Sequence, residues 1–203
     1  IVFSSSSGET LQALWRALGD DSRKSCRGLF TDRECGAAEV SKKINLACYG
    51  FEKKEFEAKV LKEVSNFKSD SLILLCGFFG ILSDKFLEQC PFPVVNTHPS
   101  LLPSHPGLDK KVHQQAHKDV CISGFSIHLV TPVLDGGTII FQHPVWMDTS
   151  LSWEESRKNI RSAEQKFLPL LWEKILNSDL KKEDTQLNSQ ILRSRLNLNK
   201  AYF

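Results

Sequence analysis

The stretch FPVVNTHPSLLP, residues 92–103, joins an apolar run directly to a polar sequence. Its apolar part and the similar run Ser71–Cys76 are typical of strands that are buried on both faces of a parallel sheet. Asn96 then closes a central strand. Ligands of open α/β sheets bind outside the carboxyl ends of the strands. We therefore expect a doubly wound α/β fold, with a mostly parallel, twisted sheet and the functional residues at this edge.

Strand-like and helix-like segments alternate along the rest of the chain, the helices being marked by apolar residues at every third or fourth position. The turn Asp135–Gly137 separates the last two strand-like segments and predicts an antiparallel pair at one edge. The expected strands are residues 1–4, 28–31, 44–48, 71–76, 93–96, 122–131 and 138–147. The expected helices are residues 8–19, 32–43 with Asp32 as cap, 53–67, 83–89, 109–118 and 152–176.

A chain of 203 residues is long enough to bury one substantial core. We expect a single domain over residues 1–176. The remaining residues, 177–203, are rich in charge, as in Lys181–Asp184, and are expected to form a loose polar tail with a short helix near residues 191–196.

The formal net charge of the chain is only +2, so charge alone attracts neither nucleic acid nor a membrane surface. No apolar run approaches the roughly 18 residues of a membrane span. We therefore expect neither nucleic acid nor a membrane as a partner. Small-molecule partners, and a monomer or a homodimer as the assembly, are separate expectations.

The cysteines are scattered, and no two of them form a C-x-x-C pair. Cys76 lies in an apolar segment, where cysteine behaves as a small hydrophobic residue. Because this pattern fits neither a zinc site nor a disulfide framework, we expect no bound metal and a reducing, cytoplasmic location.

Asn96, His98 and Asp135 are the residue types that move an acyl group onto an amine. An amide donates hydrogen bonds to a developing oxyanion, an imidazole can donate or carry a proton, and a carboxylate can hold that ring charged. Each residue alone fits a turn or a packing role as well, but together they favour an enzyme. The other histidines have no specific partner in the sequence and are expected in surface or packing roles: His105, His113, His117, His128 and His143.

Several segments together resemble the folate-dependent formyltransferases, over about residues 1–176, which would form the catalytic domain. The matching segments are residues 11–14, 76–83, 96–108, 124–135 and 136–142. The resemblance implies that the formyl group of 10-formyltetrahydrofolate, a co-substrate, is transferred to the amine of glycinamide ribonucleotide without a metal.

The resemblance also implies roles for individual residues. Asn96 and His98 would stabilise the oxygen of the tetrahedral intermediate, and Asp135 would hold His98 charged and relay the proton of the amine. The residues expected at the acceptor are Gly8, Glu9, Thr10, Pro99 and Glu164. Those expected at the pterin of the donor are Phe79, Gly80, Ile81, Leu82, Leu87, Thr131 and Val133.

Some positions depart from the family pattern, mainly at the acceptor. Glu9 places a negative charge in a loop that is expected to cradle a phosphate. Alternatively, the Glu9 carboxylate faces solvent, where it interacts favourably with the start of the helix. Gly80 stands where the family often has an arginine, and Gln165 replaces a histidine. Lys53 or Lys54 is a candidate replacement cation.

Three alternatives to this reading stay open. A related formyltransferase could act on another amine, such as an amino sugar, and a catalytically lapsed relative could bind folate without turnover. Hydrolysis of the formyl donor is disfavoured because Pro99 directly follows His98.

Overall fold

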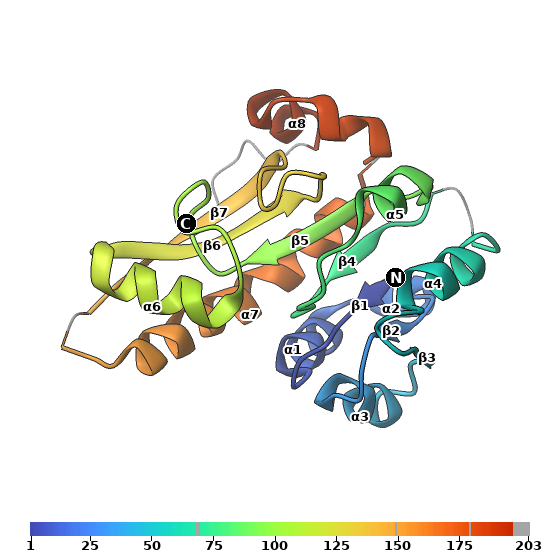
Figure 1. The fold of residues 1–203 in the computed structure, drawn as a ribbon, viewed down its shortest axis with the longest axis horizontal. Helices are drawn as coiled ribbons and strands as arrows, with labels where there is room; N and C mark the ends of the chain where they lie inside the picture. The colour runs from blue at the N-terminus through green and yellow to red at the C-terminus, as the bar shows by residue number, and fades with distance from the viewer. Residues whose placement is uncertain (68–69, 149, 179, 197–203) are drawn as a thin grey trace.

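Seven strands form one sheet in the order β3-β2-β1-β4-β5-β6-β7 (Figure 1). The computed structural model describes residues 1–67, 70–148, 150–178 and 180–196. The first five strands are parallel, β6 is antiparallel to β5, and β7 is antiparallel to β6. The expected mostly parallel sheet with an antiparallel edge is confirmed. The strands are β1 (Val2–Phe3), β2 (Leu29–Thr31), β3 (Cys48–Gly50), β4 (Ile73–Leu75), β5 (Val94–His98), β6 (Ile122–Leu129) and β7 (Ile139–Trp146).

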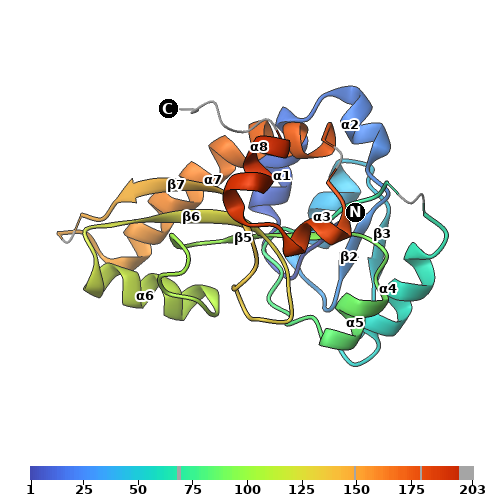
Figure 2. The ribbon, with the colours of Figure 1, turned by 90° about the horizontal axis from the view of Figure 1, so that it is seen from above.

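Helices cover both faces of the sheet, as the view from above shows (Figure 2). Ser152 and Glu155 form a capping box at the start of α7, and the Ser83 hydroxyl caps α5 by accepting from the Phe86 amide. The helices are α1 (Glu9–Ala17), α2 (Asp20–Ser25), α3 (Gly36–Lys43), α4 (Phe56–Val64), α5 (Asp84–Gln89), α6 (Asp109–Asp119), α7 (Trp153–Leu176), the 3₁₀ helix η1 (Lys182–Gln186) and α8 (Ser189–Arg195).

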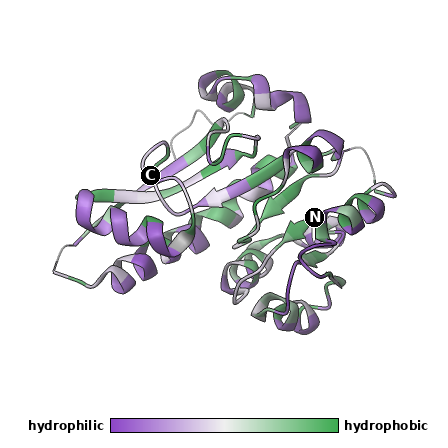
Figure 3. Ribbon diagram, viewed as in Figure 1, coloured by the Kyte–Doolittle hydropathy of each residue, from purple (hydrophilic) through white to green (hydrophobic). Residues whose placement is uncertain are grey.

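The strands β1 and β4 in the middle of the sheet are hydrophobic along their length because both of their faces are buried (Figure 3). Successive side chains of a strand point to opposite faces. Leu74 accordingly packs in the core beneath α1, α3 and α7, whereas Ile73 and Leu75 pack in the other core, beneath α4 and α5. This alternation explains why the sequence of β4 shows no polar position.

Local contacts move several elements away from their expected positions. The third helix begins at Gly36 rather than after Asp32, because the buried Asp32 carboxylate accepts hydrogen bonds from Ser5 (2.6 Å) and Arg33 instead of capping a helix. The third strand is residues 48–50 rather than 44–48, since Asn45 has a left-handed φ of 54° just after α3. The short helix α2 was not expected from the sequence.

The strand β5 continues to His98, two residues past its expected end. Asn96 and His98 therefore share one face of a single strand. None of the helices formed by the described residues is both long enough and apolar enough to cross a membrane.

The expectation of a loose tail is wrong for residues 177, 178 and 180–196. Leu180, Leu192 and Leu196 are buried in the same core as α1 and α7. The ammonium group of Lys182 donates to the carbonyl oxygens of Glu88 (2.8 Å) and Cys90 (2.6 Å). The polar composition of the segment concealed these few leucines, which are enough to attach it to the domain.

Replacing Leu192 with alanine is expected to lower the free energy of unfolding by about 2–5 kcal/mol, because the fully buried side chain leaves a cavity. Urea denaturation measures this change. The neighbouring Ile191 is 52% exposed, so Ile191→Ala is a matched control that should change stability by less than about 0.5 kcal/mol. Equal effects of the two substitutions would mean that α8 is not held by its buried face.

Candidate functional site

A pocket opens at the carboxyl ends of β1, β4 and β5. This is the edge at which α/β sheets bind ligands. Its walls come from several parts of the chain, among them the loop before α1, the loop after β4, the end of β5, the loop before α6, the loop after β6, and the middle of α7. The lining includes residues 6–7, 9–10, 77–82, 96–99, 130–132, 134–135, 160–161 and 164.

Asn96, His98 and Asp135 do lie together in this pocket. The Asp135 Oδ1 atom lies 3.6 Å from Nδ1 of His98. The loop after β6 delivers Asp135 in a left-handed conformation, with a φ of 52°, and the Gly107 amide donates to Oδ2 at 2.7 Å. The carboxylate is thus held at a fixed place although it lies far from His98 in the sequence.

His98 is buried and has an acceptor beside each ring nitrogen. Its Nε2 atom donates to the carbonyl oxygen of His105 at 2.9 Å, and Nδ1 faces the Asp135 carboxylate. The 3.6 Å between Nδ1 and Oδ1 is longer than a hydrogen bond, so with Nε2–H bonded to His105 the doubly protonated ring has its Nδ1–H beside the carboxylate and able to turn to a substrate oxygen. The geometry therefore suits an imidazolium paired with a carboxylate.

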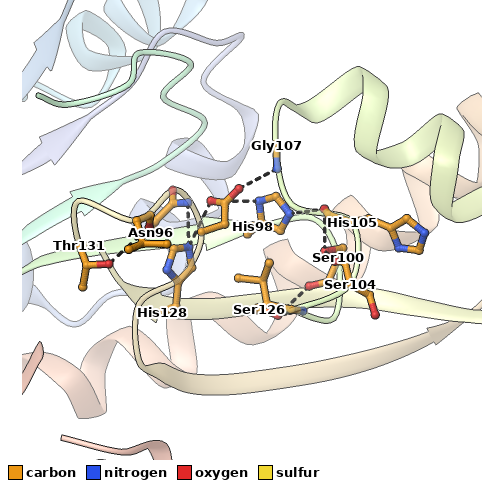
Figure 4. Close-up of polar contacts among 12 residues, drawn as sticks. Asn96, His98, Ser100, Ser104, His105, Gly107, Ser126, His128 and Thr131 are labelled. Carbon is orange, nitrogen blue, oxygen red and sulfur yellow. Dashed lines mark hydrogen bonds and ion pairs between the residues drawn. The ribbon is translucent and has the colours of Figure 1, made fainter. Parts of the chain in front are cut away.

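His128 is a member of this group that the sequence did not indicate. It is buried on β6, directly opposite Asn96 in the antiparallel register. Its Nε2 atom lies 3.1 Å from Nδ2 of Asn96 and 3.8 Å from Oδ1 of Asp135. Figure 4 shows the side chains of Asn96, His98 and His128 converging on the same space. The expected surface or packing role of His128 is corrected accordingly.

The surroundings of His128 fix the orientation of the Asn96 amide. Its Nδ1 atom lies 2.9 Å from the carbonyl oxygen of Leu129, so Nδ1 carries a hydrogen. Burial lowers the pKa of His128, although the hydrogen bond to Leu129 and the charge of Asp135 oppose that shift. The ring is therefore neutral, and Nε2 accepts from the NH₂ group of Asn96. The second hydrogen of that NH₂ group remains available toward the pocket.

The other histidines divide into two groups. His117, bonded to Ser156 (3.1 Å), and His143, packed against Phe167, lie outside the pocket as expected. The His105 side chain pairs with the exposed Asp119 at 3.3 Å, as a surface role predicts, and only its backbone oxygen bonds to His98. His113 is buried and also lines the pocket.

Most of the residues expected at the acceptor line the pocket. Glu9, Thr10, Pro99 and Glu164 line it. Gly8 is buried just behind the lining, where its φ is 82° and any β-carbon would lie only 2.7 Å from the backbone of α3, so the position requires glycine.

Arg161 was missed in the sequence, although it lines the pocket and lies 3.0 Å from a carboxylate oxygen of Glu9. Lys53 and Lys54 do not line the pocket, and Lys54 pairs instead with Glu52 at 3.1 Å. The cation beside Glu9 thus comes from α7 rather than from the loop before α4.

Most residues expected at the pterin also line the pocket: Phe79, Gly80, Ile81, Leu82 and Thr131. Two do not. Leu87 lies on the face of α5 that packs against the sheet, and its side chain is buried there. Val133 lies between Pro132 and Leu134, which line the pocket, but 68% of its own surface is exposed to solvent. Within the described part of the chain, no group of three or more His, Cys, Asp or Glu side chains is arranged to hold a metal ion.

Comparison with known proteins places this geometry among related enzymes. A family model described as formyl transferase matches residues 1–171. The phosphoribosylglycinamide formyltransferase of Bacillus subtilis is 27% identical over 182 residues, covering 86% of this chain and 93% of that protein. The Escherichia coli enzyme of the same name is 29% identical over 180 residues, covering 84% of each.

Solved structures agree with these relatives. The phosphoribosylglycinamide formyltransferase of Anaplasma phagocytophilum superposes with a TM-score of 0.76 at 28% identity, over 87% of this chain and 85% of that one. The Streptococcus pneumoniae enzyme gives a TM-score of 0.75 at 26% identity, over 86% and 96%.

Proposed function

Because the chain belongs to the formyl transferase family, we propose that it transfers the formyl group of 10-formyltetrahydrofolate to the amine of glycinamide ribonucleotide. The observation that carries the proposal is the group formed by Asn96, His98 and Asp135 in one pocket at the carboxyl edge of the sheet. This proposed reaction belongs to purine synthesis, as the relatives that include the trifunctional purine biosynthetic proteins indicate.

The residues of the pocket match the needs of this reaction. The amine nitrogen bonds to the formyl carbon, giving a tetrahedral centre with a negative oxygen and a positive nitrogen. The Asn96 amide and the Nδ1–H of the His98 imidazolium would donate hydrogen bonds to that oxygen, while Nε2–H stays on the His105 carbonyl and the nearby Asp135 carboxylate favours the charged ring. Asp135, directly or through water, would take the proton of the new amide nitrogen. The bond from the carbon to N10 of the folate then breaks, and N10 takes up a proton, leaving tetrahydrofolate and the formylated amine.

The two substrates would bind along different walls of the pocket. The pterin of the donor would lie between Phe79–Leu82 and the loop that carries Thr131, where apolar side chains and backbone polar groups are available for a flat ring. The acceptor would lie along Glu9, Thr10, Pro99 and Glu164, with its phosphate near the serine loop and the start of α1. The formyl carbon would then be beside Asn96 and His98.

A second candidate is a formyltransferase that acts on another amine. The observation that favours it is the contact between Glu9 and Arg161, which places a carboxylate at the end of the pocket proposed for a phosphate. We also propose a cytoplasmic enzyme that works as a monomer or a homodimer. All six cysteines are free, which supports a reducing compartment.

The test is an assay of the purified protein with 10-formyltetrahydrofolate and glycinamide ribonucleotide, following tetrahydrofolate and the formylated product by mass spectrometry. We expect turnover, with kcat/KM at least about tenfold higher than for the same acceptor without its phosphate, a difference of about 1.4 kcal/mol in transition-state stabilisation. A preference for the unphosphorylated amine would support the second candidate. Folate binding without turnover of either amine would contradict both and indicate a lapsed relative.

A further inference from the structure

We propose that Glu9 limits the affinity for the acceptor by competing with the acceptor's phosphate for Arg161. This inference rests on the proposed function and concerns its acceptor site. Glu9 is then a specificity-determining residue, because its carboxylate weakens the binding of amines that carry a phosphate.

The two residues meet across the pocket from separate helices. Glu9 is the first residue of α1, and Arg161 lies in the first half of α7, which packs against α1. The Oε2 atom of Glu9 lies 3.0 Å from Nη1 of Arg161. Both side chains line the pocket. The Glu9 carboxylate is therefore already paired with the guanidinium that an entering anion would meet.

Arg161 has no obvious substitute in this role. It is the one arginine or lysine among the described residues that line the pocket. Glu164, one turn further along α7, adds a second carboxylate to the same wall. A phosphate monoester placed here therefore depends on Arg161 for its charge-assisted hydrogen bonds.

The exposure of the pair makes exchange with a ligand feasible. The Glu9 side chain is 59% exposed and that of Arg161 33% exposed. Ion pairs this exposed contribute little to stability, so a phosphate can displace the carboxylate.

A purely local role for Glu9 gives a different expectation. A carboxylate in the first turn of a helix interacts favourably with the helix dipole. If that were its whole contribution, removing its charge would weaken α1 slightly and would leave acceptor binding unchanged.

The test begins with Glu9→Gln, which keeps the size of the side chain and removes its charge. We expect KM for glycinamide ribonucleotide to fall about twofold to fivefold, the range expected when the phosphate no longer has to break an exposed ion pair to reach Arg161. KM for the folate should not move. An unchanged or raised KM for the acceptor would overturn the inference.

Arg161→Gln identifies the route of the effect. We expect this substitution to raise KM for the acceptor at least about tenfold, as the loss of a charge-assisted contact predicts. Because Glu9 is proposed to act by occupying Arg161, adding Glu9→Gln in that background should have no further effect. If Glu9→Gln still lowers KM for the acceptor in the Arg161→Gln background, Glu9 does not act by competing for Arg161.

Glu39→Gln is the matched control. Glu39 pairs with Lys42 at 2.7 Å on the exposed face of α3, outside the pocket, and its substitution should leave KM unchanged. Binding of ribose 5-phosphate, measured by calorimetry, separates this inference from the proposed function. Tighter ribose 5-phosphate binding by Glu9→Gln without any turnover would support the competition while contradicting the proposed reaction. If Glu9→Gln is active but binds ribose 5-phosphate no more tightly than the wild type, the competition is contradicted and the proposed reaction is supported.

Discussion

His98→Ala is expected to lower kcat for formyl transfer by about 10²–10³, because it removes a charged donor aimed at the developing oxyanion. The ring is held on both sides, by the His105 carbonyl at 2.9 Å and by the Asp135 carboxylate at 3.6 Å, so it is positioned before the substrate arrives. Steady-state kinetics with saturating donor and acceptor measure the effect. A loss confined to KM would indicate a binding role instead.

The control for this substitution is His117→Ala, which removes an imidazole that lies outside the pocket and bonds to Ser156. Both variants should be compared by circular dichroism, since the buried His98 also takes part in packing. If folded His98→Ala retains the activity of the wild type, His98 has no part in the reaction.

The parallel sheet could be predicted because its signal is local. The residues of β4 and the first two residues of β5 alternate between two cores, so both faces select apolar side chains and each segment stands out as an apolar run. The same reasoning placed Asn96 at the carboxyl edge. The end of β5 was less predictable, because hydrogen bonding to β6 extends the strand through the polar residues Thr97 and His98.

The contributions of His128 and Arg161 could not be predicted because they depend on tertiary geometry. His128 reaches Asn96 only through the register of β5 against β6, and a shift of one residue would turn it to the other face. Arg161 reaches Glu9 only because α7 packs against α1. Neither the strand register nor the helix packing is visible in the spacing of residues along the chain.

Leu87 and Val133 illustrate the opposite error, in which a nearby sequence position suggests a contact that the fold prevents. Leu87 lies close to the Phe79–Leu82 loop in sequence, but the amphipathic helix α5 turns it toward the sheet. Val133 lies in a tight loop whose alternate residues, Pro132 and Leu134, face the pocket. The sequence indicated which loops border the pocket, but it did not indicate the direction in which each side chain of those loops points.

Asn96→Ala is expected to reduce kcat by about 10²–10³, since it removes the neutral donor of the proposed oxyanion site. The structure gives the reason that this amide is a donor at all. The Leu129 carbonyl fixes the hydrogen of His128 on Nδ1, His128 then accepts one hydrogen of the Asn96 amide at 3.1 Å, and the other hydrogen is left for the substrate. The exposed Asn66 lies outside the pocket, and Asn66→Ala is the control.

Asn96→Asp separates the loss of a donor from the loss of volume. The aspartate has the same shape as asparagine, but it has only acceptors to present to His128 Nε2 and to the oxyanion. We therefore expect Asn96→Asp to lose as much activity as Asn96→Ala, about a hundredfold or more, even though it leaves no cavity. Recovery of activity in Asn96→Asp would show that Asn96 acts by filling space, and the oxyanion would then have to be stabilised by His98 without it.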